Sequence, residues 1–227
     1  MSNITNLQKE LFKYQDIKYR DFQIKLVPNI NSSDIIGIRT PDLKNITKEF
    51  SIKDDVKLFL NDLPHKYLEE NLIHMFLISN IKDFDICVSE LNKFLPYVNS
   101  WPVSDQSSPK IFKKNHQKLI SIIKNWMKSP HLYTARYGIR ILMNEFLDDD
   151  FNESYLKLVS EIKTNEYYLQ MMIAWFFATA LAKQYDKTIY YFENHILDAN
   201  IHKKAIQKAI DSFRVTKEHK NYLRKLR

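Results

Sequence analysis

Apolar residues recur every three to four positions along most of this chain, the spacing of amphipathic helices. Along 109–128 the apolar side chains fall on one helical face, and the opposite face is cationic, with Lys110, Lys113, Lys114, Lys124 and Lys128. The segment 167–182 is apolar nearly all round, which predicts a central buried helix, near 166–184. Further helices are predicted near 3–14, 16–27, 54–62, 65–80, 84–95, 131–147, 152–163, 187–196, 201–213 and 216–225.

Helix-start signals support this pattern. Thr40, Pro41 and Asp42 read as an N-cap, a proline in the first turn and an acid near the positive end of the helix dipole. Ser108 and Pro109 repeat the device before the cationic segment. About twelve short helices without a strict sequence repeat favour stacked helix pairs, which is an irregular α-solenoid. No flexible linker is visible, so we expect a single domain over 1–227.

Glycine occurs only twice, as Gly37 and Gly138. Phosphate-binding loops, dinucleotide fingerprints and the nucleophile elbow each need several glycines at fixed spacing, so none of them is built into this chain. The scarcity of glycine also argues against a many-stranded β protein, because hairpin turns favour it. The seven histidines lack zinc-ligand spacing and the single cysteine, Cys87, has no catalytic context, so we expect no metal and no cofactor.

No segment indicates a membrane protein. The longest apolar run, 171–178, has eight residues, whereas a membrane helix needs about 18. Met1 to Ile4 lack the basic and apolar regions of a signal peptide. A single cysteine is typical of a reducing compartment. We therefore expect a cytoplasmic protein.

Positive charge gathers in two segments of a chain whose net charge is +7. Residues 106–144 hold eight basic residues and no acidic one, and residues 200–227 hold nine basic and two acidic residues. Such asymmetry is typical of a protein that binds a polyanion. The alternative is a set of solvated helix faces in a lysine-rich protein.

Three places depart from what packing alone requires. Trp101 stands four residues before Asp105 in a segment predicted to connect two helices, so the pair presents an aromatic face and a carboxylate. The alternative is a tryptophan at the core edge and an aspartate that caps a helix. Arg136 lies two residues before the helix-interior Gly138, which indicates a close approach of another backbone or of a ligand, although an ion-paired surface arginine is the commoner case. Trp175 lies in the most apolar helix, where core packing is the simpler interpretation.

Five segments together carry a family resemblance, and they occur in the family's order from about residue 37 to 215. They are 37–43 (GIRTPDL), 63–67 (LPHKY), 100–105 (SWPVSD) with Pro109, 136–139 (RYGI) and 170–175 (QMMIAW). In these segments the chain resembles the DNA alkylation repair family of AlkD-like DNA glycosylases. The resemblance implies an α–α superhelix of HEAT-like helical repeats with a concave cationic groove.

The same resemblance implies a function and a site. Its members hydrolyse the N-glycosidic bond of cationic N3- or N7-alkylated purines in double-stranded DNA, a step of base excision repair. By matching segments, the catalytic residues fall on Trp101, Asp105, Arg136 and Trp175. Backbone binding is then expected from the basic residues Lys110, Lys113, Lys114, Arg140, Lys203, Lys204, Lys208 and Arg214.

One position departs from the family pattern. Pro102 stands where active members often carry an acidic residue directly after the tryptophan. The alternative function is therefore a non-catalytic helical-repeat module that binds DNA or a protein partner. In either case we expect a monomer.

Overall fold

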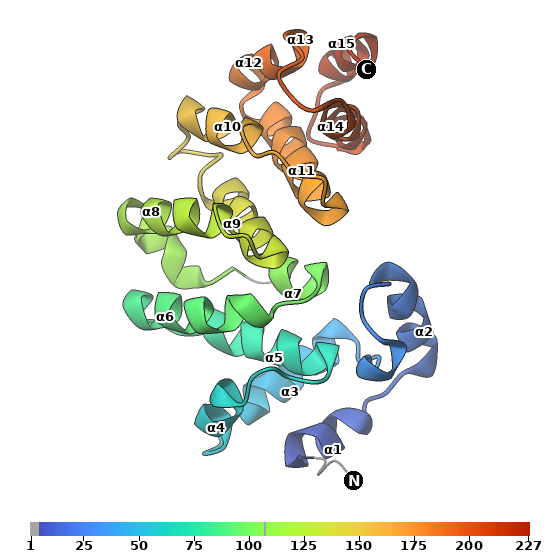
Figure 1. Ribbon diagram of the computed structural model, residues 1–227, viewed down its shortest axis with the longest axis vertical. Helices are drawn as coiled ribbons and strands as arrows, with labels where there is room; N and C mark the ends of the chain where they lie inside the picture. The colour runs from blue at the N-terminus through green and yellow to red at the C-terminus, as the bar shows by residue number, and fades with distance from the viewer. Residues whose placement is uncertain (1–4, 107) are drawn as a thin grey trace. The chain divides into compact units, whose positions relative to one another are not determined.

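The computed structural model describes residues 5–106 and 108–227, and every regular element within these ranges is a helix (Figure 1). Met1 to Ile4 lie outside the described residues, and so does the predicted start of the helix near 3–14. The chain divides into two compact units: unit 1 ends at Phe112 and unit 2 begins at Lys113. No described helix is both long and apolar enough to cross a membrane. The all-α class is thus confirmed, whereas a single repeat domain stays a prediction.

Unit 1 holds the helices from the N-terminus to the segment that precedes the unit boundary. They are α1 (Asn6–Phe12), α2 (Ile17–Leu26), α3 (Thr40–Phe50), α4 (Val56–Asn61), α5 (Leu68–Ser79), α6 (Phe84–Phe94) and α7 (Trp101–Asp105). Short 3₁₀ helices are η1 (Ser32–Asp34), η2 (Leu95–Tyr97) and η3 (Lys110–Lys114), the last of which contains the boundary.

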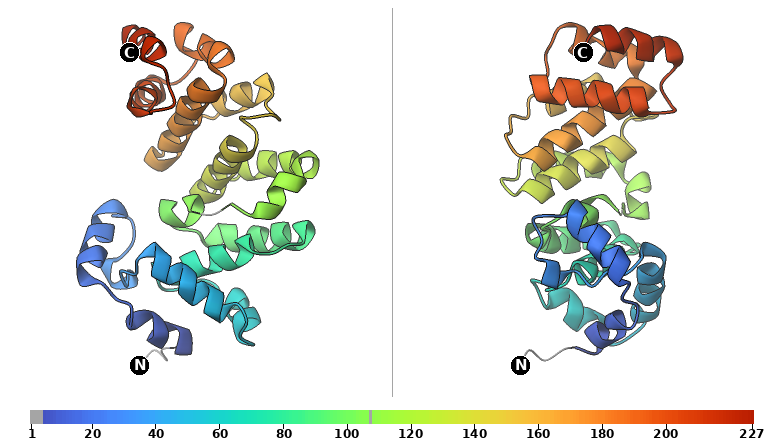
Figure 2. Two further views of the ribbon diagram at one scale, coloured as in Figure 1. Left: turned by 180° about the vertical axis from the view of Figure 1, so that it is seen from behind. Right: turned by 90° about the vertical axis from the view of Figure 1, so that its right-hand side faces the viewer.

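Unit 2 holds the remaining helices. They are α8 (His116–Met127), α9 (Leu132–Glu145), α10 (Glu153–Ser160), α11 (Tyr167–Lys183), α12 (Tyr185–Thr188), α13 (Tyr190–Glu193), α14 (Ala199–Asp211) and α15 (Lys217–Lys225). In this unit α8 packs on α9, α9 on α11, and α11 on α14 (Figures 1 and 2). The helices α9, α11 and α14 therefore follow one another side by side.

Helix α5 is the centre of unit 1. Every one of its residues is buried, and α3, α6 and α7 pack against it. Near its start the fully buried carboxylate of Glu69 accepts hydrogen bonds from the backbone N–H groups of Ile36, Gly37 and Ile38, at 3.0, 2.8 and 3.3 Å. Burial raises the pKa of Glu69, and these bonds oppose the rise. The carboxylate thus fixes the segment that leads into α3.

Both glycines sit where a side chain does not fit. Gly37 has φ of +90°, and a Cβ atom there would lie 2.7 Å from the carbonyl oxygen of Asp16. A Cβ atom on Gly138 would lie 2.9 Å from the backbone nitrogen of Met127, because α8 and α9 approach each other closely at this point. The close approach indicated by Gly138 is therefore to another helix of the same unit.

Several predicted boundaries need correction. The cationic segment 109–128 is not one helix, because η3 ends at Lys114 and α8 begins at His116. The segment around Trp101 is not a simple connection, since α7 starts at that residue with Pro102 in its first turn. The helix predicted at 187–196 is wrong, because the two short helices α12 and α13 occupy that part of the chain. Thr40 is the first residue of α3 rather than its N-cap.

Candidate functional site

The candidate site residues of unit 1 lie on the short helix α7. It packs against α5 and begins at Trp101, after Ser100 in an extended conformation. The indole Nε1–H of Trp101 donates a hydrogen bond to the carbonyl oxygen of Leu26, at the end of α2, over 3.1 Å. This bond fixes the direction of the ring.

Asp105 ends α7 and is 9% exposed. It stands four residues after Trp101, so the two side chains share one helix face. The hydroxyl of Ser104 donates to its carboxylate over 3.0 Å. The alternative in which Asp105 begins a helix is wrong, because the carboxylate lies at a helix end. The site thus offers a held carboxylate beside a tethered indole.

The first candidate site residue of unit 2 lies on α9. Arg136 is 6% exposed, and its guanidinium donates a hydrogen bond to the carbonyl oxygen of Tyr168, in the first turn of α11. The alternative of a surface arginine is therefore wrong. Burial lowers the pKa of Lys208 on α14, and the positive charge of Arg136 lowers it further.

Trp175 departs from its surroundings in α11. Its indole is 38% exposed, whereas Ala174 and Phe176 on either side are completely buried. The interpretation of Trp175 as a core residue is therefore wrong. The guanidinium of Arg140, on α9, lies 5.6 Å from the centre of the indole ring, within the range of a cation–π contact.

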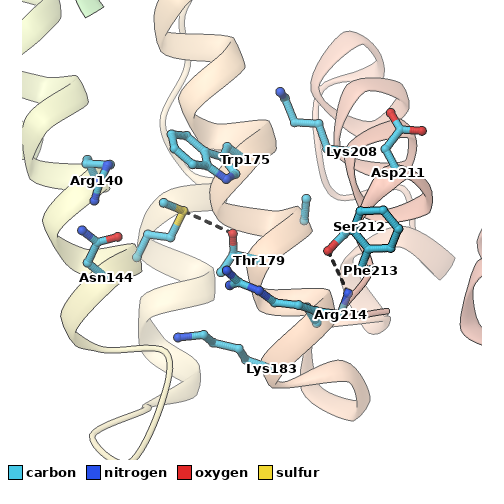
Figure 3. A pocket seen from close by; sticks show the side chains of 13 residues that line it. Arg140, Asn144, Trp175, Thr179, Lys183, Lys208, Asp211, Ser212, Phe213 and Arg214 are labelled. Atoms are coloured by element: carbon cyan, nitrogen blue, oxygen red, sulfur yellow. Dashed lines mark hydrogen bonds between the residues drawn. The ribbon is translucent and has the colours of Figure 1, made fainter. Parts of the chain in front are cut away.

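Trp175 borders a pocket of about 610 Å³ that lies wholly within unit 2 (Figure 3). Its walls come from α9, α11, α14 and the turn after α14. Its lining includes one acidic residue, Asp211, and four basic residues, which are Arg140, Lys183, Lys208 and Arg214. Lys183 is paired with Asp148 over 2.6 Å. The pocket combines an aromatic face with positive charge, which suits an anionic ligand with flat apolar surfaces.

The structure gathers some predicted residues and separates others. Arg140, Trp175, Lys208 and Arg214 line one pocket. Arg136 does not line it, although its positive charge lowers the pKa of Lys208. Trp101, Asp105 and Lys110 belong to unit 1. The exposed lysines Lys113 and Lys114 end η3, Lys203 is exposed on α14, and the Lys204 ammonium lies 5.4 Å from the ring centre of Tyr167.

Sequence reasoning missed the other residues that line the pocket, and Asn144, Thr179, Lys183 and Phe213 are among them. Asn144 follows the predicted Arg140 by four positions, and Thr179 and Lys183 follow the predicted Trp175 by four and eight positions. Helical spacing from Arg140 and Trp175 was therefore the signal that identifies them. Phe213 gave no such signal, because it lies in a turn.

Among the described residues we find neither a metal-binding cluster nor a reactive thiol. Within residues 5–106 and 108–227 no three His, Cys, Asp or Glu side chains are placed to hold a metal ion. Burial raises the pKa of the Cys87 thiol to about 12, so it is not a nucleophile at neutral pH.

Two comparisons with known proteins bear on the family of this chain. A comparison with curated proteins found no match. The family model described as "DNA alkylation repair enzyme" matches residues 7–212, which includes all the candidate site residues except Arg214. Because the match extends over most of the chain, this protein belongs to the DNA alkylation repair enzyme family.

Proposed function

We propose that this chain is a DNA glycosylase that hydrolyses the N-glycosidic bond of cationic N3- or N7-alkylated purines in duplex DNA. Membership of the family supports a role in the repair of alkylated DNA. The observation that carries the proposal is the exposure of Trp175 in a buried apolar helix, at the edge of a cationic pocket. As scaffold we propose HEAT-like repeats in an α–α superhelix, which the successive packing of α9, α11 and α14 supports within unit 2.

The chemistry suits the residues. An alkylated purine leaves as a neutral base, so the reaction needs little help from a general acid. The remaining task is to stabilise the positive charge that develops on the deoxyribose and to orient a water molecule. A carboxylate does both, and Asp105 is the carboxylate that α7 holds in place. An electron-rich indole face also favours a developing cation, and this role is proposed for Trp101 and for Trp175.

Backbone binding is proposed for the cations around the pocket. Arg140, Lys208 and Arg214 line it and come from three different elements. Arginine and lysine side chains in such a pocket bind phosphates without reading the base sequence. A phosphate contact of Arg136 stays a prediction, because its guanidinium is buried and bonds to the Tyr168 carbonyl.

The test is an assay of base release from methylated duplex DNA with the wild type and Asp105→Asn. The substitution keeps the shape of the side chain and removes its negative charge, so we expect release of 7-methylguanine to fall by about 100-fold or more while duplex affinity persists. Asp54→Asn, an exposed aspartate of unit 1, is the matched control and should release base at the wild-type rate.

Two outcomes would contradict parts of this proposal. Release by Asp105→Asn at the wild-type rate would remove Asp105 from the reaction. No release by the wild type from any alkylated duplex would leave a non-catalytic module. In that case weak, salt-insensitive DNA binding would identify a protein as its partner.

A further inference from the structure

A second pocket, of about 720 Å³, lies wholly within unit 1, and we call it the unit 1 pocket. Its walls come from α3, α4, the C-terminal end of α5 and the chain that follows α7. No described acidic residue lines it, whereas three lysines do, and these are Lys44, Lys48 and Lys110. A volume of this size is typical of small-molecule sites. The charge of the lining favours an anionic molecule.

The three lysines lack a compensating charge. All are exposed, and none forms an ion pair with another described residue. Lys44 and Lys48 stand four positions apart on α3, so their ammonium groups share one helix face and repel each other. Lys110 adds a third positive charge from η3. An anion bound among these lysines would relieve the repulsion.

Much of the remaining lining is apolar, and it consists of Val56, Leu60, Phe76, Leu77 and Ile81. The ammonium group of Lys44 lies 5.7 Å from the centre of the Phe76 ring, within the range of a cation–π contact. Positive charge and an aromatic face therefore lie side by side. An inorganic anion would use only the charge. A ligand that uses the whole pocket carries a flat apolar body next to its negative group.

Polar side chains of the pocket suit the recognition of that body. The side-chain amides of Asn80 and Gln106 line the pocket, and neither has a hydrogen-bond partner among the described residues. Such amides pair with the donor and acceptor edge of adenine. The hydroxyls of Thr47 and Ser51 each donate to a carbonyl oxygen of α3 over 2.7 Å, so their oxygens act as acceptors toward a ligand. A phosphoryl group only accepts hydrogen bonds, which leaves it to the lysines.

We propose that the unit 1 pocket binds a free purine nucleotide. The lysines hold its phosphoryl group, the ring of Phe76 contacts the base, and the amides of Asn80 and Gln106 pair with the edge of the base. The inference does not rest on the proposed DNA substrate. Gln106 directly follows Asp105 in the chain, so a nucleotide bound here contacts the neighbour of the proposed reacting carboxylate.

Isothermal titration calorimetry with 2′-deoxyadenosine 5′-monophosphate tests the proposal. We expect the wild type to bind it with a dissociation constant of about 1 mM or less. Inorganic phosphate and deoxyadenosine should each bind about tenfold more weakly, because each makes only part of the contacts. Lys48→Gln should weaken nucleotide binding about fivefold, since it removes one charge-assisted hydrogen bond. Lys57→Gln changes an exposed lysine of α4 outside the pocket, so this matched control should bind as the wild type does.

Urea unfolding separates ligand binding from a structural role of the lysine. Because the lysines repel one another, Lys48→Gln should unfold at a urea concentration no lower than that of the wild type. The nucleotide should raise the unfolding midpoint of the wild type more than that of Lys48→Gln. A lysine that serves stability alone would lower the midpoint without the nucleotide and leave the effect of the nucleotide unchanged.

Three outcomes would overturn the inference. If Lys48→Gln binds the nucleotide as tightly as the wild type, the lysines do not hold its phosphoryl group. If Lys208→Gln abolishes binding and Lys48→Gln does not, the nucleotide occupies the pocket beside Trp175. If Lys48→Gln weakens binding of duplex DNA and leaves nucleotide binding unchanged, the lysines bind the DNA backbone. Base release by the wild type and Asp105→Asn is measured separately, so the proposed hydrolysis can fail while nucleotide binding stands.

Discussion

The two units of this chain place charge in opposite ways. In unit 1 the carboxylates of Glu69 and Asp105 are buried and accept hydrogen bonds from the chain itself. In unit 2, Lys208 and Arg214 line an open pocket. A held carboxylate keeps one position and suits the stabilisation of a developing charge, whereas cations at a pocket remain available to an anionic ligand. The contrast supports a proposed division in which unit 1 supplies the reacting carboxylate and unit 2 supplies most backbone binding.

Each unit holds one glycine, and substitution of these glycines is expected to cause the largest losses of unfolding free energy. Gly37→Ala places a side chain at positive φ and within 2.7 Å of the Asp16 carbonyl oxygen, so we expect unit 1 to lose about 3 kcal/mol of unfolding free energy. Gly138→Ala meets the Met127 backbone nitrogen at 2.9 Å and should cost unit 2 about 2 kcal/mol. Urea unfolding measures both.

The control for these substitutions is Asn125→Ala, an exposed position of α8, which should change the free energy by less than about 0.5 kcal/mol. DNA affinity per folded molecule should survive Gly138→Ala. A large loss of affinity in a fully folded Gly138→Ala protein would show that position 138 lacks a side chain because DNA approaches it, rather than because α8 packs there.

Much of the helical framework follows from the sequence, and the exceptions have physical causes. The break between η3 and α8 falls at Asn115, where the sequence has no proline or glycine that would predict a break. Helix α7 has five residues, too few for an apolar period to be visible. Both errors concern short elements, where tertiary packing decides the conformation.

The site was less predictable than the helices. The exposure of Trp175 was hidden because α11 is apolar on all sides, so its sequence pattern marks no solvent face. Phe213 and Lys183 are 30 residues apart in the chain, and only the packing of α11 on α14 brings them to one pocket. The candidate catalytic residues came from the family resemblance rather than from periodicity.

Buried histidines give the next largest expected difference between the two units, which is a difference in how stability depends on pH. In unit 1 the rings of His65 and His74 are 2.7 Å apart between nitrogens, and burial lowers their pKa values to about 4 and about 3. Unfolding returns each pKa to about 6.5, so the unfolded chain binds more protons below that pH. Stability is therefore lost as the pH falls from 6.5. For His74 alone the loss at pH 5 is about 2 kcal/mol.

The contribution of His116 in unit 2 should have the opposite sign. His116 donates to Asp150 over 2.5 Å and contacts Glu145 over 3.3 Å. Burial lowers its pKa, but the hydrogen bonds and charges of these carboxylates outweigh it and raise the pKa above 6.5. This contribution is present below pH 6.5 and is lost as the pH rises through the raised value, and it amounts to less than about 1 kcal/mol.

Imidazole titration by NMR measures both clusters in one sample. We expect the signals of His65 and His74 to stay those of neutral rings down to pH 5, and the signal of His116 to stay protonated above pH 6.5. His116→Gln identifies its signal by difference. Titration of His74 near pH 6.5 would mean that water reaches the pair and that unit 1 does not lose stability in mild acid.

The tryptophans give the smallest difference in stability and the closest test of the division between units. Trp101→Phe removes the Nε1–H that bonds to Leu26, so we expect unit 1 to lose about 1 kcal/mol of unfolding free energy. Trp175→Phe keeps an aromatic face beside Arg140 and loses no such bond, so unit 2 should change by less than about 0.5 kcal/mol. If the proposed reaction is correct, Trp101→Phe and Trp175→Phe should both release 7-methylguanine more slowly than the wild type, because phenylalanine presents a weaker aromatic face to the developing cation. Urea unfolding and base release are measured on the same preparations. Wild-type release by Trp175→Ala would confine the reaction to unit 1, since the exposed indole would then serve binding alone.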